Sequence, residues 1–336
     1  MRRAVVLITG AAGEIGHELI RRLADEERAP IVTIDLRELD EELRRRVQRA
    51  VTGSILDRPL LDALLAEYEV DRIFHLAALL STRAEFTPVA AHEVNVEGTL
   101  NLLEFAQGQA RSHGRRVMFF YPSSIAAYGT SRAEDGGRAL REEEANRPIT
   151  MYGCNKLYCE HLGRYYARHY KQLDAVPHAG LVDFRSIRFP GLISATTVPS
   201  GGTSDYAPEM IHAAARGEPY RCFVRPDTRI PFMTMPDAVE ATLRFARTPA
   251  ENLTQLVYNI SAFNPSAEEI RELVMRAFPS ADITFEPDEK RQAIVDSWPA
   301  AVDDSAARRD WGFAPKHDLE RAFDEYLIPE IARRYS

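Results

Sequence analysis

The opening of the chain restricts its possible folds more than any other stretch. Residues 4–8 form an unbroken apolar run, which predicts a strand buried on both faces of a parallel sheet. The run leads into a turn at residues 9–16 with three glycines, and a helical pattern follows. Such a turn lets the backbone approach a pyrophosphate, whose charge then lies at the helix N-terminus. We therefore expect a dinucleotide site here, and a purely structural turn is the alternative.

A second apolar run at residues 31–34 ends at Asp35, about twenty residues after the turn, as in dinucleotide-binding units. A carboxylate there accepts hydrogen bonds from both hydroxyls of an adenosine ribose and repels a 2′-phosphate, which favours NAD over NADP. Arg37 lies nearby and weakens that exclusion. Asp57 precedes a helix that begins near Pro59, so it can either contact adenine or cap the helix.

Strand and helix patterns then continue to alternate. Residues 72–78 predict a further strand that ends in small side chains, which leave room for a cofactor across the strand ends. Within it, His75 is expected to be a hydrogen-bonded core histidine. Residues 117–121 predict the next strand, and Ser124 follows at its carboxyl end. The alternation predicts an α/β fold with a doubly wound parallel sheet.

Tyr152 and Lys156 stand four residues apart at the start of an apparent helix. They therefore project from one face, and an ammonium can lie beside a phenol. A phenolate base at neutral pH needs its pKa lowered by about three units, and a fixed cation supplies part of that. This pair alone indicates only a solvated helix face. Because it follows a dinucleotide motif and Ser124, the three side chains together are a far more specific indication of a catalytic site.

Composition limits the function classes. With 336 residues, we expect one large domain and a smaller satellite. A formal charge of −8 argues against nucleic acid or an anionic membrane as the main partner, and no apolar stretch is long enough to span a bilayer. The three cysteines lack CxxC spacing, which argues against a structural metal site and fits a reduced, cytoplasmic protein.

Together these motifs resemble the extended short-chain dehydrogenase/reductase family, also called the NAD-dependent epimerase/dehydratase family. It carries TGxxGxxG, a Ser ahead of a YG pair, and YxxxK. The resemblance implies a Rossmann-type sheet, a smaller C-terminal α/β substrate lobe and NAD. It also implies that Ser124 and Tyr152 bond the reacting oxygen, and that Lys156 holds the nicotinamide ribose and lowers the Tyr152 pKa. Asn95 would support Lys156 through its backbone and water.

The second half carries a Gly-Gly-Thr-Ser-Asp turn ahead of a helix, at residues 201–205. Its hydroxyls, free N–H groups and carboxylate suit the amine and carboxylate of an amino acid, although helix capping alone is an alternative. With PSSIAAYG, DSWP and DDSAARRDWG, this part resembles the short-chain L-threonine 3-dehydrogenases. The resemblance places Ser81 and Thr203 against substrate. Arg83 and Arg229 depart from its pattern and could favour an acidic substrate.

The resulting expectations are specific. Predicted catalytic residues are Ser124, Tyr152, Lys156 and Asn95. Predicted cofactor contacts are Gly10, Gly13, Glu14, Ile15, Gly16, Asp35, Leu36, Arg37, Leu56, Asp57, Leu76, Ala77, Ala78, Tyr152, Lys156, Phe189 and Pro190. Predicted substrate contacts are Ser81, Ser124, Tyr152, Gly202, Thr203 and Asp205, and no metal is expected.

The expected reaction is NAD-dependent oxidation of a small 3-hydroxy amino acid, L-threonine to 2-amino-3-ketobutyrate. One alternative is a sugar-nucleotide epimerase or dehydratase with a diphosphate bound by Arg216, Arg221, Arg225 or Arg229. The other is a non-catalytic NAD-binding sensor. Residues 1–189 and 228–262 are assigned to the NAD-binding domain, and residues 190–227 and 263–336 to the substrate lobe. Helices at 88–110 and 151–171 would form a homodimer surface, by resemblance.

Overall fold

A computed structural model describes residues 3–131, 134, 136–176, 180–199 and 201–335. Its centre is a seven-stranded parallel sheet with the order β11-β7-β5-β4-β1-β2-β3. The strands are β1 (Arg3–Thr9), β2 (Ile31–Asp35), β3 (Arg49–Thr52), β4 (Tyr68–His75), β5 (Val117–Ser124), β7 (Val182–Phe189) and β11 (Val257–Asn259). The predicted doubly wound parallel sheet is confirmed.

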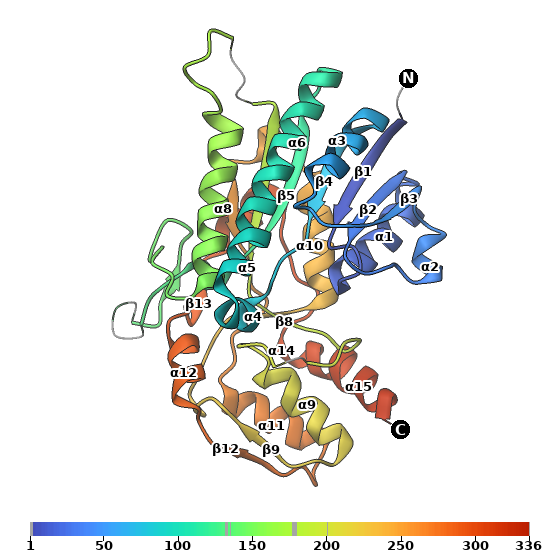
Figure 1. The fold of residues 1–336 in the computed structure, drawn as a ribbon. Helices are drawn as coiled ribbons and strands as arrows, with labels where there is room; N and C mark the ends of the chain where they lie inside the picture. The colour runs from blue at the N-terminus through green and yellow to red at the C-terminus, as the bar shows by residue number, and fades with distance from the viewer. Residues whose placement is uncertain (1–2, 132–133, 135, 177–179, 200, 336) are drawn as a thin grey trace.

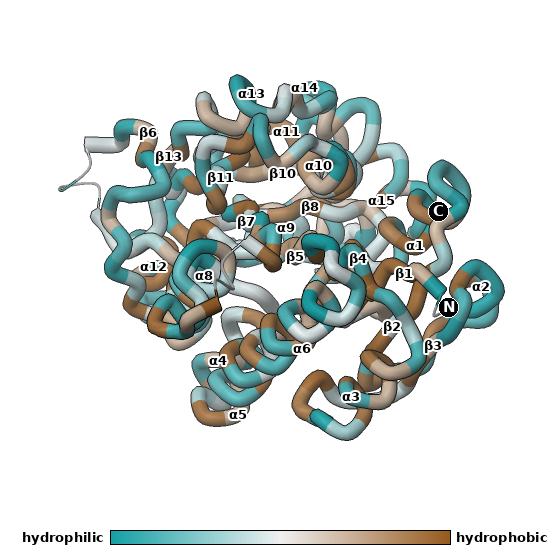
Figure 2. The backbone as a smooth tube through the Cα atoms, turned by 90° about the horizontal axis from the view of Figure 1, so that it is seen from above, coloured by the Kyte–Doolittle hydropathy of each residue, from teal (hydrophilic) through white to brown (hydrophobic). Residues whose placement is uncertain are grey.

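Helices cover both faces of the sheet, and Figure 2 shows the strands from above between the two layers. One layer holds α3 (Arg58–Glu67), α6 (Gly98–His113) and α8 (Met151–Arg168). The other holds α1 (Glu14–Glu26), α2 (Glu41–Arg44), α10 (Met235–Arg247) and α13 (Ser305–Trp311). Because both faces are buried, the strands can be apolar throughout, as residues 4–8 are.

The strand order reverses beside β1, which lies between β2 and β4. Open α/β sheets bind ligands outside the carboxyl ends of their strands at such a reversal. The turn at residues 9–16 and the loop after β4 both begin there. The strand predicted at residues 72–78 is displaced toward the N-terminus. It is β4, which ends at His75, so Leu76, Ala77 and Ala78 lie in the loop beyond it.

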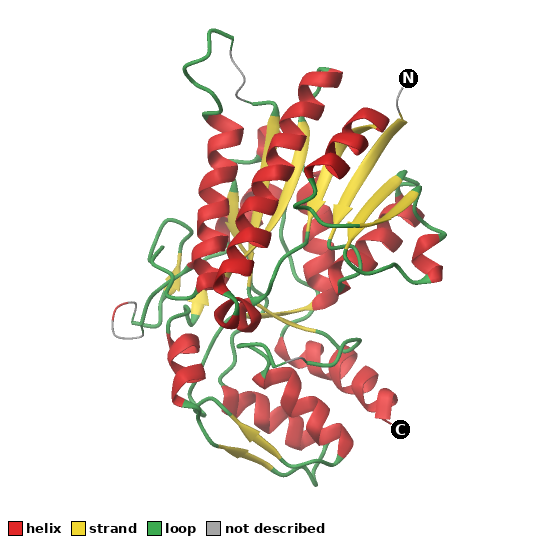
Figure 3. Ribbon diagram, viewed as in Figure 1, coloured by secondary structure: helices red, strands yellow, loops and turns green. Residues whose placement is uncertain are grey.

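A smaller set of helices and short strand pairs lies below the sheet in Figures 1 and 3. The pairs are β8 (Gly191–Ile193) with β10 (Phe232–Thr234), β9 (Tyr220–Cys222) with β12 (Ile283–Phe285), and β6 (Ala139–Leu140) with β13 (Ala301–Val302). The helices are α9 (Tyr206–Arg216), α11 (Ala267–Ala277), α12 (Glu289–Asp296), α14 (Leu319–Arg321), η4 (Ala322–Leu327) and α15 (Ile328–Tyr335).

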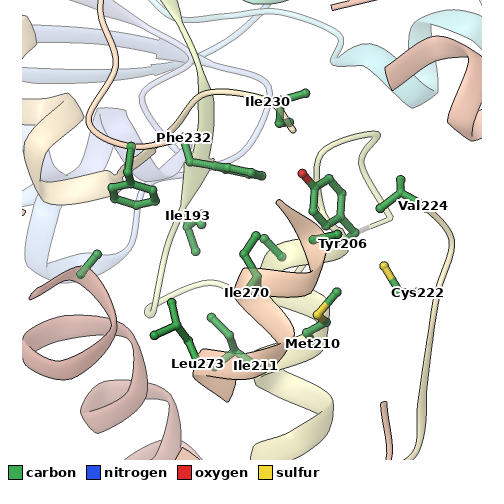
Figure 4. Close-up of a cluster of buried hydrophobic side chains, with 14 of the residues drawn as sticks. Ile193, Tyr206, Met210, Ile211, Cys222, Val224, Ile230, Phe232, Ile270 and Leu273 are labelled. Atoms are coloured by element: carbon green, nitrogen blue, oxygen red, sulfur yellow. The ribbon is translucent and has the colours of Figure 1, made fainter. Parts of the chain in front are cut away.

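This lobe has its own core, in which Tyr206 and Phe232 pack edge to face at 5.7 Å (Figure 4). The division into two lobes remains a proposal. Residues 263–336 were assigned to the smaller lobe, but α13 packs with the sheet: the ring centres of Trp311 and Phe245 are 5.1 Å apart.

Three short helical elements complete the sheet side between β4 and α6. They are α4 (Ser81–Phe86), α5 (Pro88–His92) and the π-helical η1 (Glu93–Glu97). Two 3₁₀ turns, η2 (Ile125–Ala127) and η3 (Ala250–Asn252), follow β5 and α10. No helix in the described part of the chain is both long and apolar enough to cross a membrane.

Candidate functional site

The glycine turn is packed against the loop that follows β4. Gly10 has a φ of +68°, and a Cβ at this position would lie 2.5 Å from the backbone nitrogen of Ala77. Gly16 is equally confined, because its Cβ would lie 2.6 Å from the carbonyl oxygen of Ala11. The Gly13 N–H closes the turn onto the Gly10 carbonyl at 3.1 Å. Glycine is therefore required for this turn to lie beside Ala77 at the strand ends.

Asp35 lies at the end of β2 and faces the glycine turn. Its carboxylate accepts hydrogen bonds from the backbone N–H groups of Ala12 and Arg37, both at 2.9 Å. The Arg37 guanidinium donates to the Ala12 carbonyl at 2.7 Å. The acid, the arginine and the turn thus meet at the sheet position where an adenosine ribose binds in dinucleotide folds. These residues fit NAD: the glycines leave room for a pyrophosphate and the acid stands at the ribose position.

Three further predicted cofactor contacts lie directly after β2 and directly before α3. Leu36 is 74 % exposed and Leu56 37 % exposed, so each presents an apolar side chain to solvent. The Asp57 carboxylate accepts from the Leu60 N–H at 3.0 Å, which confirms the capping interpretation of this residue. Adenine contact by its other oxygen stays a prediction.

Ser124, Tyr152 and Lys156 come together where β5 meets the start of α8. Thr150 caps α8 by accepting from the Gly153 N–H at 3.0 Å, so Tyr152 stands in the first helical turn. A Cβ on Gly153 would lie 2.0 Å from the Ala126 carbonyl oxygen. The glycine after the tyrosine therefore allows α8 to approach the chain immediately after Ser124.

The Lys156 side chain is buried beneath two tyrosines. Its nitrogen lies 5.3 Å from the ring centre of Tyr152 and 4.6 Å from that of Tyr121, and it donates to the Pro122 carbonyl at 2.6 Å. Burial lowers the Lys156 pKa to about 8. The predicted juxtaposition of ammonium and phenol is present.

The predicted lowering of the Tyr152 pKa is not a property of this environment. Burial raises the pKa of Tyr152 above its ordinary value, because removal from water disfavours the phenolate. The ammonium beside the ring does not reverse that direction. A phenolate at this position would require further positive charge close to its oxygen.

Asn95 lies in η1 and holds the loop after β4. Its side-chain amide accepts from the Leu79 N–H at 2.8 Å and donates to the Leu79 carbonyl at 3.0 Å. Its own carbonyl accepts from Thr99 and Cys159. The structure thus assigns Asn95 direct contacts with this loop, whereas the direct hydrogen bond of Lys156 is to Pro122. His75 is confirmed as a core residue: it is hydrogen-bonded to Thr9 and Thr99, and burial lowers its pKa to about 3.

Two predicted substrate residues from distant parts of the chain come together. The Thr203 hydroxyl donates to that of Ser81 over 3.4 Å, and the Thr82 hydroxyl donates to the Gly201 carbonyl over 3.1 Å. Asp205 precedes α9, but its carboxylate accepts from the Gly202 N–H at 2.6 Å rather than from the helix. The turn at residues 201–205 therefore rests on the first turn of α4.

Four arginines that could bind a diphosphate each have a carboxylate partner. Arg216 pairs with Glu218, Arg221 with Glu286, Arg225 with Asp296 and Arg229 with Glu269, over 2.7, 3.0, 2.8 and 2.8 Å respectively. Surface ion pairs of this kind contribute only about 0–1 kcal/mol each, so an incoming diphosphate can exchange with these carboxylates.

Sequence reasoning missed a buried polar network behind Ser124. Ser123 donates to Glu160 at 2.5 Å, and the Arg188 guanidinium donates to both oxygens of Glu160 at 2.8 and 2.6 Å. Arg188 also lies over the ring of Tyr128, 4.5 Å from its centre. Helical spacing could have indicated Glu160, which follows Lys156 by one turn, but it gives no indication of Arg188 on β7.

The other predicted cofactor residues are placed at the same edge. Phe189 ends β7 and is buried against Phe120, and Pro190 joins β7 to β8. Ile15 is half-buried in the first turn of α1. The Glu14 carboxylate accepts hydrogen bonds from hydroxyls of residues 194–197. In the described ranges, no group of three or more His, Cys, Asp or Glu side chains could hold a metal ion.

Comparison with known proteins gives consistent matches. Residues 6–261 match the NAD dependent epimerase/dehydratase family. The chain is 37 % identical to bovine mitochondrial L-threonine 3-dehydrogenase over 316 residues, 94 % of this chain and 79 % of that protein. It is 35 % identical to an uncharacterised epimerase/dehydratase of Staphylococcus haemolyticus over 94 % of this chain and 93 % of the relative. A monomeric L-threonine 3-dehydrogenase from a metagenome superposes with a TM-score of 0.84 at 33 % identity, covering 99 % and 100 % of the two chains.

Proposed function

The chain belongs to the NAD dependent epimerase/dehydratase family, and on that premise we propose that it is an NAD-dependent dehydrogenase that oxidises L-threonine to 2-amino-3-ketobutyrate. The observation that supports the proposal is that Lys156 lies beside the Tyr152 ring and bonds Pro122 on β5, the strand that ends at Ser124. This end of β5 is on the same carboxyl edge of the parallel sheet as the glycine turn after β1. Similarity to proteins named L-threonine 3-dehydrogenases supports the choice of substrate.

The protein groups have separate tasks in this proposal. The Ser124 hydroxyl holds the substrate oxygen, and the Tyr152 oxygen removes its proton as general base. Lys156 holds a positive charge beside the phenol and is kept in place by the Pro122 carbonyl. NAD, when bound, supplies the hydride acceptor and a positively charged ring. Because burial raises the Tyr152 pKa, both positive charges are needed for the phenolate to form.

The polar groups next to α8 suit a small substrate, because α4, which begins at Ser81, contacts α8. Ser81 and Thr203 meet over 3.4 Å, which brings two hydroxyls from separate elements to one place. They can take up the amine and carboxylate of an amino acid.

Replacement of Tyr152 by Phe tests the proposal. Turnover of threonine, followed by NADH absorbance, should fall by about 10²–10⁴-fold because the general base is lost. NADH affinity, measured by fluorescence, should change less than about twofold. Tyr335→Phe is the matched control, because it removes a phenol oxygen from α15, where Tyr335 contacts His212 and, in the described part of the chain, none of the site residues. Full activity in Y152F would eliminate the mechanism.

Two assays separate the alternatives. Accumulation of NADH with threonine supports the dehydrogenase, whereas turnover of UDP- or GDP-sugars without net NADH supports an epimerase or dehydratase. A sensor protein would bind NADH and give neither reaction.

We also propose that the chain forms a homodimer through α5 and α8. Val89 on α5 and Tyr158 and Tyr165 on α8 are exposed, and α5 contacts α8. Pairing this surface with a second copy would remove the apolar groups from water. Sedimentation velocity should give a dimer mass for the wild type and a monomer for Tyr158→Glu. A wild-type monomer at micromolar concentration would contradict this.

A further inference from the structure

Glu14 makes an unusual set of contacts for a residue in a cofactor-binding turn. It is the first residue of α1, directly after Gly13. Its carboxylate accepts hydrogen bonds from three hydroxyls: Ser194, Thr196 at 2.8 Å and Thr197 at 2.9 Å. No ion pair of Glu14 occurs among the residues that the structure describes, so these hydroxyls, and no cation, are its side-chain partners there.

The segment that carries these hydroxyls follows β8 and belongs to the smaller lobe. It is held from its other side as well, because Tyr326 accepts from the Ala195 N–H at 3.1 Å and Arg334 donates to the Thr196 carbonyl at 3.0 Å. Figure 1 shows this stretch below the sheet, on the side of α15. Glu14 therefore joins the cofactor helix to the smaller lobe.

The position of Glu14 creates an electrostatic conflict. The N-terminus of α1 is where the fold would hold the cofactor pyrophosphate. A carboxylate in the first turn interacts favourably with the same partial positive charge. Two anionic groups at one helix end repel each other, unless one is directed away and its charge is spread over hydrogen-bond donors.

We propose that Ser194, Thr196 and Thr197 form a carboxylate receptor that positions Glu14 away from the pyrophosphate and fastens the smaller lobe over that part of the cofactor. The three hydroxyls determine how tightly a diphosphate-containing cofactor binds. The direction of the Glu14 carboxylate thus affects how the cofactor binds, and Glu14 takes no part in the chemistry. This inference depends on dinucleotide binding, and it does not depend on threonine as the substrate.

The test is a double-mutant cycle measured by binding. One variant carries S194A, T196V and T197V together, a second carries E14Q, and a third carries all four changes. Affinities for NADH and ADP-ribose are measured by fluorescence and calorimetry, with adenosine as a ligand that lacks phosphate. T197V alone serves as a milder variant, because Thr197 is exposed and the change should leave folding intact.

The hydroxyl-free variant should bind NADH and ADP-ribose about tenfold or more weakly, because the free carboxylate then repels the pyrophosphate. Adenosine binding should be unchanged. Adding E14Q to that variant should restore most of the lost affinity, since it removes the charge. T197V should bind NADH and ADP-ribose about two- to threefold more weakly, again with adenosine binding unchanged.

Three results would overturn the proposal. The first is that the variant without the three hydroxyls binds ADP-ribose with the affinity of the wild type. The second is an equal loss for adenosine, which would indicate a general structural defect. The third is a loss that E14Q does not reverse. If the wild type bound neither NADH nor ADP-ribose, the proposed function itself would fail, and that outcome is distinct from these three.

Discussion

Replacing Glu160 by Gln would leave the buried Arg188 guanidinium without its carboxylate. The Arg188 and Glu160 side chains are 2 % and 5 % exposed, and their closest atoms are 2.6 Å apart. At that distance and an effective dielectric constant of about 20, two unit charges attract by about 6 kcal/mol. Most of this is offset by the cost of removing both charges from water. Loss of one partner leaves that cost uncompensated, so we expect E160Q to lower the free energy of unfolding by about 3–5 kcal/mol.

The assay is urea unfolding followed by circular dichroism, with extrapolation to zero denaturant. The double variant E160Q/R188M removes both charges and should recover most of the loss, since no unpaired charge is then buried. Glu286→Gln is the surface control: its pair with Arg221 is exposed, with side-chain fractions of 65 % and 75 %, and it should cost less than about 1 kcal/mol. If E160Q cost no more than E286Q, the reasoning about burial would be refuted.

Three further predictions follow from local geometry. Burial lowers the Lys156 pKa to about 8 from 10.5, so the cost of burying its charge is complete below pH 8 and fades by pH 10.5. K156M removes that cost together with the hydrogen bond to Pro122, so the change in the free energy of unfolding should be about 3 kcal/mol more favourable at pH 7 than at pH 10.5, and turnover should be abolished. Equal gains at both pH values would contradict this. G10A should abolish NADH binding in a fluorescence titration, because its Cβ would meet Ala77, whereas G217A, with the same φ of +68° but open space around it, should cost only about 1–2 kcal/mol and keep affinity. D35S should raise the NADP-to-NAD ratio of kcat/KM by about tenfold, and an unchanged ratio would show that the acid does not select the cofactor.

Much of the larger lobe could be predicted because its information is local. A run such as residues 4–8 has no polar face, which predicts a strand covered on both sides, and Val5 to Ile8 are indeed buried. The glycine turn admits few side chains, and Gly10 shows why: its φ is positive and Ala77 occupies the space of a Cβ. The four-residue spacing of Tyr152 and Lys156 likewise determines a shared helix face.

Local patterns were less informative where a residue has two possible partners. Asp57 precedes a helix and caps it, as its position allowed, but its spacing also permitted a ligand contact. A lowered Tyr152 pKa was predicted in part from the adjacent amine, and burial moves this pKa in the opposite direction. Burial depends on how α8 packs against β5, which helical spacing does not contain.

The sequence by itself determined the strands of the large sheet, the glycine turn and the shared helix face of Tyr152 and Lys156, because each depends on a short local pattern. Only the tertiary structure decided which charges are neutralised. Glu14 meets Thr196 from 182 positions away, and Glu160 meets Arg188 across 28. A charge can be satisfied by any donor that folding brings within about 3 Å, and sequence spacing does not restrict that choice.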